Sequence, residues 1–201
     1  MTPPRLLLAS QSESRRRLLR DAGVLFEAVT AGVDEDAAKG ALIGEGLNPR
    51  DLADALAELK ALRPSQREPD ALVLGCDQTL ALGDGTLVNK CADREEARAL
   101  LLRLSGTRHH LHSAAVVTWG GAPIWRQIES VAMDVRVLSP AFIDTYLDAE
   151  WDQCRWCVGC YRIEGPGAQL FARVTGSLFA VQGLPLLPLL DFLRVRGVLA
   201  A

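Results

Sequence analysis

Basic and small polar residues follow the first apolar segment of this 201-residue sequence. Residues 6–9 are apolar, residues 10–12 read Ser-Gln-Ser, and Arg15, Arg16 and Arg17 come next. The pattern predicts a buried strand, a turn of small residues and a helix with cations in its first turn. A helix N-terminus offers free backbone N–H groups and a partial positive charge, so anions bind there readily. Cations in this turn oppose that partial charge unless an anion lies between the two. The arrangement therefore indicates an anion site, and the alternative is a solvated basic turn.

Asp77 directly follows a second apolar run, residues 71–76. A carboxylate in this place is either held by partners or placed to do chemistry, because burying it unpaired costs free energy. A Gly-Asp-Gly turn at 83–85 predicts a hairpin that Lys90 closes. We therefore expect Asp77 and Lys90 to face the same cleft.

Lys60 lies on a helix that Asn48 caps, and Glu35 lies in the acidic stretch 34–36. Taken alone, each residue is explained as a solvated side chain on the protein surface. As a set they suit a polyphosphate and a hard divalent cation, because Arg and Lys bind phosphate oxygens and carboxylates bind Mg²⁺. The groups that would neutralise the polyphosphate are Ser10, Arg15, Lys60 and Lys90. The metal ligands would be Glu35 and Asp77.

This set favours hydrolytic attack on a phosphoanhydride. An Asp with an ordinary pKa, about 3.9, is a poor base for bulk water. Beside a metal-bound water of lowered pKa, Asp77 is far better placed to accept a proton.

The composition is typical of a single globular domain, residues 1–201, with 49% hydrophobic and 23% charged residues. A formal net charge of −3 argues against a nucleic-acid polymer as partner, whereas a small anion needs only a local cluster of cations. No apolar stretch reaches the roughly 20 residues that span a bilayer, and the first residues lack a secretory apolar segment. We expect a cytoplasmic protein with a small-molecule partner and no membrane.

Five cysteines are present, and three of them form a C-x-x-C-x-x-C pattern. The pattern suggests a metal or cluster site as one alternative. In an extended segment, however, Cys157 and Cys160 would point to opposite faces, which favours buried structural thiols. The cysteines are Cys76, Cys91, Cys154, Cys157 and Cys160.

Strands and helices alternate along the chain, which predicts an α/β (α+β) class with a twisted mixed sheet flanked by helices and a central cleft. The predicted strands are 6–9, 71–76, 79–82, 86–88, 111–119, 129–138 and 170–174. The predicted helices are 12–22, one beginning at Asn48-Pro49, one from 93 to 104, one from 140 to about 147, and 186–195. Residues 31–45 are predicted to be an acidic loop or a short helix.

The motifs resemble, in order and spacing, those of the Maf family of nucleoside triphosphate pyrophosphatases. The matching segments are 8–19, 33–35, 56–61, 74–78, Lys90, 104–109 and 183–186. The resemblance covers essentially the whole chain and implies a Maf/ITPase-like fold. It also implies cleavage between the α and β phosphates, a divalent metal cation (Mg²⁺ or Mn²⁺), and Asp77 as the proton acceptor. The family is cytoplasmic, is often described as dimeric, and has been linked to inhibition of septum formation.

The family's substrate-sorting positions fall on Ser14, Gln78 and Glu164. Gln78 and Glu164 resemble the subgroup that acts on N7-methyl-GTP. A carboxylate can accept hydrogen bonds from guanine N1–H and its exocyclic amine, and 7-methylation makes the ring cationic, so Glu164 would also attract it by charge. Trp156 or Tyr161 could add cation–π stacking, although the alternative for both is a core position.

The chain departs from that subgroup at several positions. Ser14 stands where the subgroup has Trp, Glu13 replaces a proline, Arg162 replaces a lysine, and residues 89–91 read Asn-Lys-Cys in place of Gly-Lys-Pro. The first alternative is therefore the same reaction on dTTP, UTP or another modified nucleotide. A second is a non-catalytic nucleotide-binding regulator of cell division, and a third is a cysteine-ligated metal protein.

Overall fold

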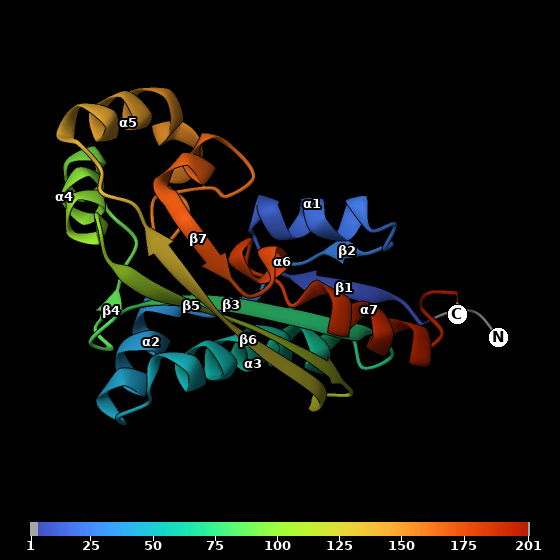
Figure 1. Ribbon diagram of the computed structural model, residues 1–201. Coiled ribbons are helices and arrows are strands. Elements are labelled where there is room, and N and C mark those ends of the chain that lie inside the picture. The colour runs from blue at the N-terminus through green and yellow to red at the C-terminus, as the bar shows by residue number, and fades with distance from the viewer. Residues whose placement is uncertain (1–3, 201) are drawn as a thin grey trace.

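A twisted mixed sheet with helices on both faces forms the centre of the computed structural model, which describes residues 4–200 (Figure 1). The strands are β1 (Leu6–Ala9), β2 (Glu27–Ala28), β3 (Leu72–Leu82), β4 (Leu87–Val88), β5 (Arg108–Trp119), β6 (Ala122–Val135) and β7 (Phe171–Thr175). The helices are α1 (Glu13–Asp21), α2 (Glu35–Gly44), α3 (Pro49–Arg67), α4 (Arg94–Leu104), α5 (Pro140–Cys154), the 3-10 helix η1 (Pro166–Leu170), α6 (Leu178–Val181) and α7 (Leu186–Val195).

The sheet has the strand order β2-β1-β3-β5-β6-β7, and β4 pairs with β3 off this path. The β2, β1 and β3 strands are parallel, whereas β5, β6 and β7 continue the sheet in antiparallel fashion. The predicted class, a mixed sheet flanked by helices, is confirmed.

Alternation along β1 shows how the sheet separates two cores. Leu6 and Leu8 pack toward α1 and α7, in a cluster with Leu19 and Leu189. Residues 7 and 9 point to the opposite face, where Ala61 of α3 covers them. Both faces of this strand are buried, which explains its continuous apolar sequence.

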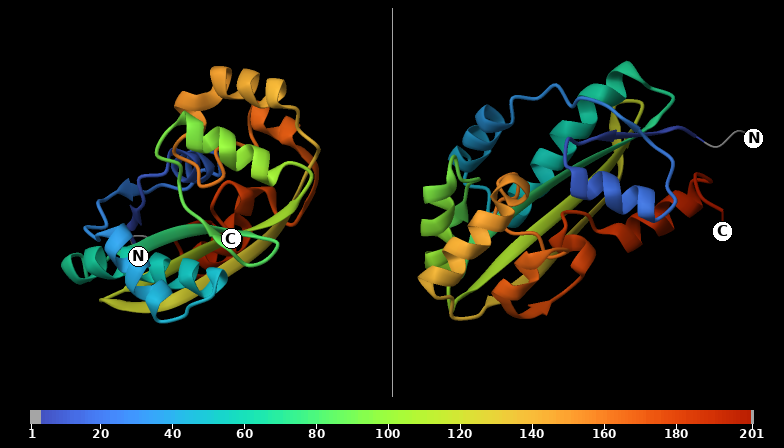
Figure 2. Two further views of the ribbon diagram at one scale, coloured as in Figure 1. Left: turned by 90° about the vertical axis from the view of Figure 1, so that its left-hand side faces the viewer. Right: turned by 90° about the horizontal axis from the view of Figure 1, so that it is seen from above.

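The third core lies over the other half of the sheet, where α4 and α5 pack together (Figure 2). Leu101 and Leu104 of α4 meet Ile143 and Leu147 of α5 above Met133 of β6. Helices α1 and α7 therefore cover one half of the sheet, and α4 and α5 cover the other.

The structure corrects several predicted boundaries. The two strands predicted at 71–76 and 79–82 form one uninterrupted strand, β3, so Asp77 lies inside a strand and does not follow its end. Of the two alternatives predicted for the acidic stretch, the helix is confirmed, since α2 begins at Glu35 and is capped by the Asp34 side chain. The α5 helix continues beyond 147 to Cys154, and β6 begins earlier than predicted, at Ala122. Among residues 4–200, no helix combines the length and apolar character needed to cross a bilayer.

Candidate active site

One cavity of about 810 Å³ brings together segments from most of the chain. Eight of the nine site residues predicted from the sequence line it: Ser14, Arg15, Glu35, Lys60, Asp77, Gln78, Lys90 and Glu164. The ninth, Ser10, lies just behind the wall, where its Oγ accepts a hydrogen bond from Arg15 Nη1 at 3.2 Å. The structure thus brings the predicted residues together around one cavity.

The cavity lies along an unpaired stretch of the β3 edge. Pairing with β1 ends at Ala9↔Gly75, and pairing with β4 begins at Leu80↔Val88. Within residues 4–200, no strand pairs with 76–79 on this side. Ligands often bind where neighbouring strands part, because side chains and backbone groups there are free to face a cleft.

Two carboxylates meet at one buried lysine. The Lys60 ammonium lies 2.6 Å from Asp77 Oδ1 and 2.8 Å from Glu35 Oε2. Side-chain exposure is 8% for Lys60 and 13% for Asp77, but 54% for Glu35. Lys60 is therefore not the solvated helix lysine that its sequence position allows, because its charge is held inside the cavity by two acids.

Gly75 allows α3 to lie directly on β3. A Cβ at Gly75 would come within 2.1 Å of the Ala57 carbonyl oxygen and 2.8 Å of the Ala61 amide nitrogen. Any larger residue would have to push the helix away from the strand. This contact sets Lys60, one position before Ala61, against Asp77, two positions after the glycine.

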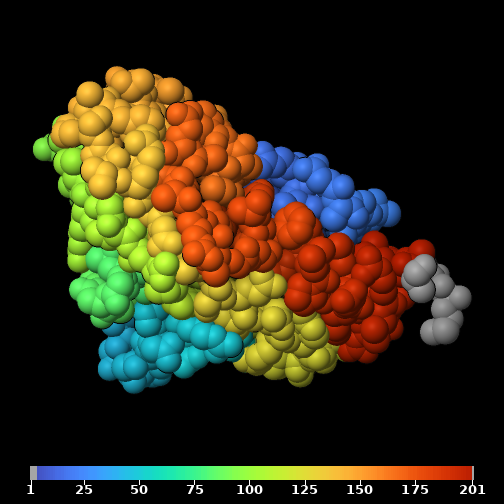
Figure 3. Space-filling model, in the orientation of Figure 1, coloured from blue at the N-terminus to red at the C-terminus, as the bar shows by residue number. Residues whose placement is uncertain are grey.

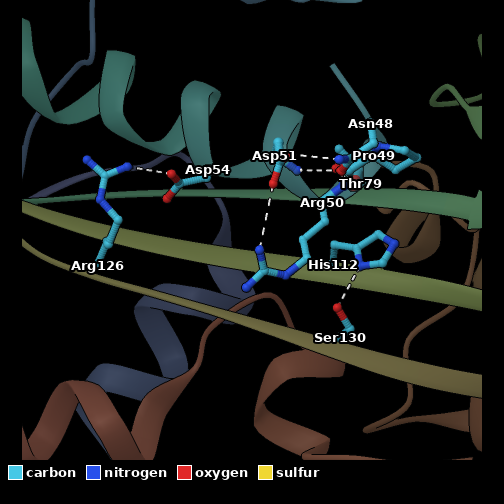
Figure 4. A network of polar contacts seen from close by, with 9 residues as sticks. All are labelled: Asn48, Pro49, Arg50, Asp51, Asp54, Thr79, His112, Arg126 and Ser130. Carbon is cyan, nitrogen blue, oxygen red and sulfur yellow. Dashed lines mark hydrogen bonds and ion pairs between the residues drawn. The ribbon is translucent and has the colours of Figure 1, made fainter. Parts of the chain in front are cut away.

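Polar contacts of the N-terminal half of α3 hold this helix against the sheet (Figure 4). Asn48 caps the helix by accepting hydrogen bonds from the amides of Arg50 and Asp51. Thr79 Oγ1, on β3, donates to the Pro49 carbonyl at 2.7 Å, and Arg126 of β6 pairs with Asp54. The helix that carries Lys60 is thus held at both the strand of Asp77 and a more distant strand.

Arg15 uses most of its guanidinium within the protein. Nε donates to the Gly183 carbonyl at 2.7 Å, and Nη1 donates to the Cys76 carbonyl at 3.1 Å as well as to Ser10. Arg15 is 8% exposed, so the alternative prediction, a solvated basic turn, is wrong for this arginine. It ties the turn after β1 to the open edge of β3 and to residue 183.

Lys39 is a cavity cation that the sequence analysis missed. Its Nζ donates to Asn89 Oδ1 at 2.6 Å, next to the exposed Lys90. Partial burial lowers the pKa of Lys39, and the negative charge of Asp77 counters that effect. The available signal was helical spacing, since Lys39 comes four residues after Glu35 and therefore shares its face of α2.

Amide and carboxylate groups also line the cavity. Glu164 Oε1 accepts from Arg17 Nη2 at 2.9 Å and from Ser14 Oγ at 3.2 Å. The Gln78 amide nitrogen donates to Ser113 Oγ and to the carbonyls of residues 180 and 181. Figure 3 shows the orange segment that includes Glu164 in contact with the blue α1 region.

The segment after α5 is a series of turns, so the extended conformation considered for Cys157 and Cys160 is wrong. Strand alternation does not separate the two cysteines, and the backbone is instead turned at Cys160, which has a φ of 53°. Burial raises the pKa of Cys157 to about 11 and that of Cys160 further. Tyr161 is buried and bonds His109, whereas Trp156 is 68% exposed and lines the cavity.

The acidic groups at Lys60 fit a divalent cation that takes its remaining ligands from a phosphate chain and water. Mg²⁺ in such sites is commonly bound through one or two carboxylates together with substrate phosphates. Asp77 and Glu35 reach the same Lys60 nitrogen, so their oxygens can converge on one small cation. Within residues 4–200, no group of three or more acidic, histidine or cysteine side chains could hold a metal by itself.

A nucleotide-sized cavity lined by cations, carboxylates and amide groups defines an α/β protein with a site suited to phosphorylated ligands. The chain belongs to the Maf family, since the family model described as Maf-like protein matches residues 5–196. It is 52% identical over 199 residues to a nucleoside triphosphate pyrophosphatase of Caulobacter vibrioides, covering 99% of this chain and 98% of the relative.

Two further similarities were found. A 7-methyl-GTP pyrophosphatase of Mesorhizobium japonicum is 47% identical over 195 residues, covering 97% of this chain and 98% of the relative. A solved HAM1 protein from Coxiella burnetii superposes with a TM-score of 0.39 at 17% identity, covering 66% of this chain and 73% of its own. The family assignment rests on the family model and the sequence relatives.

Proposed function

We propose that the chain hydrolyses a nucleoside triphosphate between the α and β phosphates, releasing a monophosphate and pyrophosphate. The observation that carries the proposal is the Lys60 ammonium held between Asp77 and Glu35, inside a cavity of about 810 Å³. Membership of the Maf family supports it, because relatives at 52% and 49% identity are named nucleoside triphosphate pyrophosphatase.

Asp77 is the proton acceptor in this mechanism. Lys60 holds Asp77 through Oδ1, so Oδ2 is the oxygen that takes the proton of the attacking water. A divalent cation, Mg²⁺ or Mn²⁺, bound by Glu35 and Asp77 would supply a water of lowered pKa and neutralise phosphate charge.

The cations bind the phosphate chain. Lys90 and Lys39 offer ammonium groups at the mouth of the cavity, where they neutralise the triphosphate and the departing pyrophosphate. Arg15 and Ser10 keep the turn after β1 in place, so that the first turn of α1 presents its backbone N–H groups to a phosphate.

N7-methyl-GTP is the proposed substrate. Glu164, which lines the cavity, can accept from guanine N1–H and the exocyclic amine, and it attracts the cationic methylated ring. Gln78 forms the neighbouring wall, and Ser14 leaves space where a larger residue would stand. The relative named 7-methyl-GTP pyrophosphatase, at 47% identity, supports this choice.

The test is turnover of a nucleotide panel with chromatographic identification of products. We expect 7-methyl-GTP to give 7-methyl-GMP and pyrophosphate faster than GTP, UTP or dTTP. Equal or faster turnover of UTP or dTTP would assign the alternative substrate class, and release of orthophosphate would contradict the cleavage position. We expect the reaction to occur in the cytoplasm.

Asp77→Asn separates the enzyme from a nucleotide-binding regulator. Loss of the general base should lower kcat by about 10²- to 10⁴-fold, with nucleotide affinity changed far less. The matched control is Asp84→Asn at the exposed hairpin tip, which should leave turnover unchanged because Asp84 only bonds the Thr86 amide. Tight binding by the unmodified chain without hydrolysis under either metal would favour the regulator.

A further inference from the structure

Glu164 is held by two donors from one helix. Ser14 and Arg17 are three residues apart on α1, so their side chains share one face, and both reach Glu164 Oε1. Glu164 is 15% exposed, and Arg17 is 41% exposed. Because both donors use the same oxygen, Oε2 keeps its capacity to accept from a ligand.

Arg17 also contacts the cavity wall beside Glu164. Its Nη2 lies 3.4 Å from Gln182 Oε1, and both Gln182 and Glu164 line the cavity. The neighbouring Arg15 turns the other way, toward Gly183 and Cys76. The two arginines therefore contact different parts of the cavity wall: Arg15 lies at the open edge of β3, and Arg17 lies beside Glu164.

We infer that Arg17 is a positioning residue that fixes Glu164 for base recognition and limits the preference for a cationic base. The inference rests on the proposed function. With Arg17 in place, the carboxylate forms a neutral pair, so a 7-methylguanine ring gains attraction from Glu164 and meets repulsion from Arg17. A neutral guanine depends mainly on hydrogen bonds to Oε2, which the pair leaves intact.

The strength of the effect follows from Coulomb's law. Two unit charges roughly 7 Å apart, at an effective dielectric constant of about 40 to 80, change binding by about threefold to sevenfold. Removing the arginine charge should therefore raise the selectivity for 7-methyl-GTP over GTP by that factor. Base contacts are made in both ground and transition states, so the change should fall on KM, with kcat altered less than about twofold.

The experiment compares Arg17→Gln, Arg17→Lys and a control on the same helix. We expect Arg17→Gln to raise the ratio of kcat/KM values for 7-methyl-GTP and GTP, and Arg17→Lys to keep the original ratio because it keeps the charge. Arg20→Gln is the control, since it removes the exposed Arg20–Glu13 pair, 2.8 Å long, on the same helix. Thermal unfolding of each variant verifies that it folds.

Two outcomes would overturn the inference: an unchanged ratio in Arg17→Gln, or an equal change in Arg20→Gln, which would indicate a merely structural ion pair. Calorimetric titration with 7-methyl-GMP and GMP measures the same ratio without catalysis. A chain that hydrolyses no nucleotide would therefore contradict the proposed function, while the binding ratio would still decide the role of Arg17.

Discussion

Lowering the pH from about 7.5 to about 5 should destabilise the folded chain by about 2 kcal/mol through His109 alone. Burial lowers the pKa of His109 from the ordinary 6.5 to about 4. Its Nε2 lies 2.7 Å from the hydroxyl of Tyr161, and its Nδ1 is buried without a hydrogen-bond partner among residues 4–200. Tyr161 belongs to the turns that line the cavity, so this histidine supports the wall of the site.

The sign follows from proton binding. Between pH 4 and 6.5 the unfolded chain protonates His109 and the folded chain does not, so proton binding stabilises the unfolded state as the pH falls. The contribution is fully present above pH 6.5 and is lost toward pH 4. One pKa unit corresponds to about 1.4 kcal/mol, so the full shift amounts to about 3 kcal/mol, of which about 2 is lost by pH 5.

Urea unfolding at several pH values between about 5 and 7.5 measures this slope. His109→Leu lowers stability at every pH but should remove the loss that His109 contributes on the acidic side. His110→Gln, on the same strand and only partly buried, should keep that loss. If the slope in His109→Leu equals that of the unmodified chain, the buried neutral histidine is not its source and the reasoning fails.

Two further predictions concern the geometry and charge of the site. Gly75→Ala should cost about 1–3 kcal/mol or more, because its Cβ meets backbone atoms of α3, and should lower turnover by moving Lys60 from Asp77. Urea unfolding and kinetics check this against Gly44→Ala, whose Cβ would meet nothing within 4 Å; equal stability of the two variants would refute the close contact. Lys90→Ala should raise KM for a triphosphate by about threefold to tenfold, an effect that salt weakens. Steady-state kinetics at low and high ionic strength measure it, and an effect that grows with salt would contradict a simple charge contribution.

Local signals in the sequence predicted much of the framework. Capping residues at Asn48, Asp93 and Ser139 predict helix starts, and each of these side chains bonds a first-turn amide in the structure. The hairpin at residues 83–85 was equally clear. These features depend on neighbours within a few residues, so the sequence alone contains their cause.

Features set by distant partners were harder to predict. Nothing local shows that Gly75 touches Ala57, or that Arg17 reaches Glu164, 147 residues later. The backbone conformation of residues 157–161 is also hard to predict from the sequence, because apolar and small residues suit either a strand or packed turns. The prediction that Asp77 follows the end of a strand was wrong because β3 continues past Asp77. The pairing that extends the strand is made with β5, a distant segment of the chain.

Successive side chains of β3 point to opposite sides of the sheet, and Asp77 and Gln78 use this alternation at the unpaired edge. Asp77 pairs in register with Ala114, which packs beneath α3, whereas Gln78 pairs with Ser113, which bonds α6. A bound nucleotide that touches both must therefore wrap around the strand. A lineage can alter the residue at 78 by point substitution, but an insertion or deletion upstream that slips the register by one would turn the carboxylate to the wrong side.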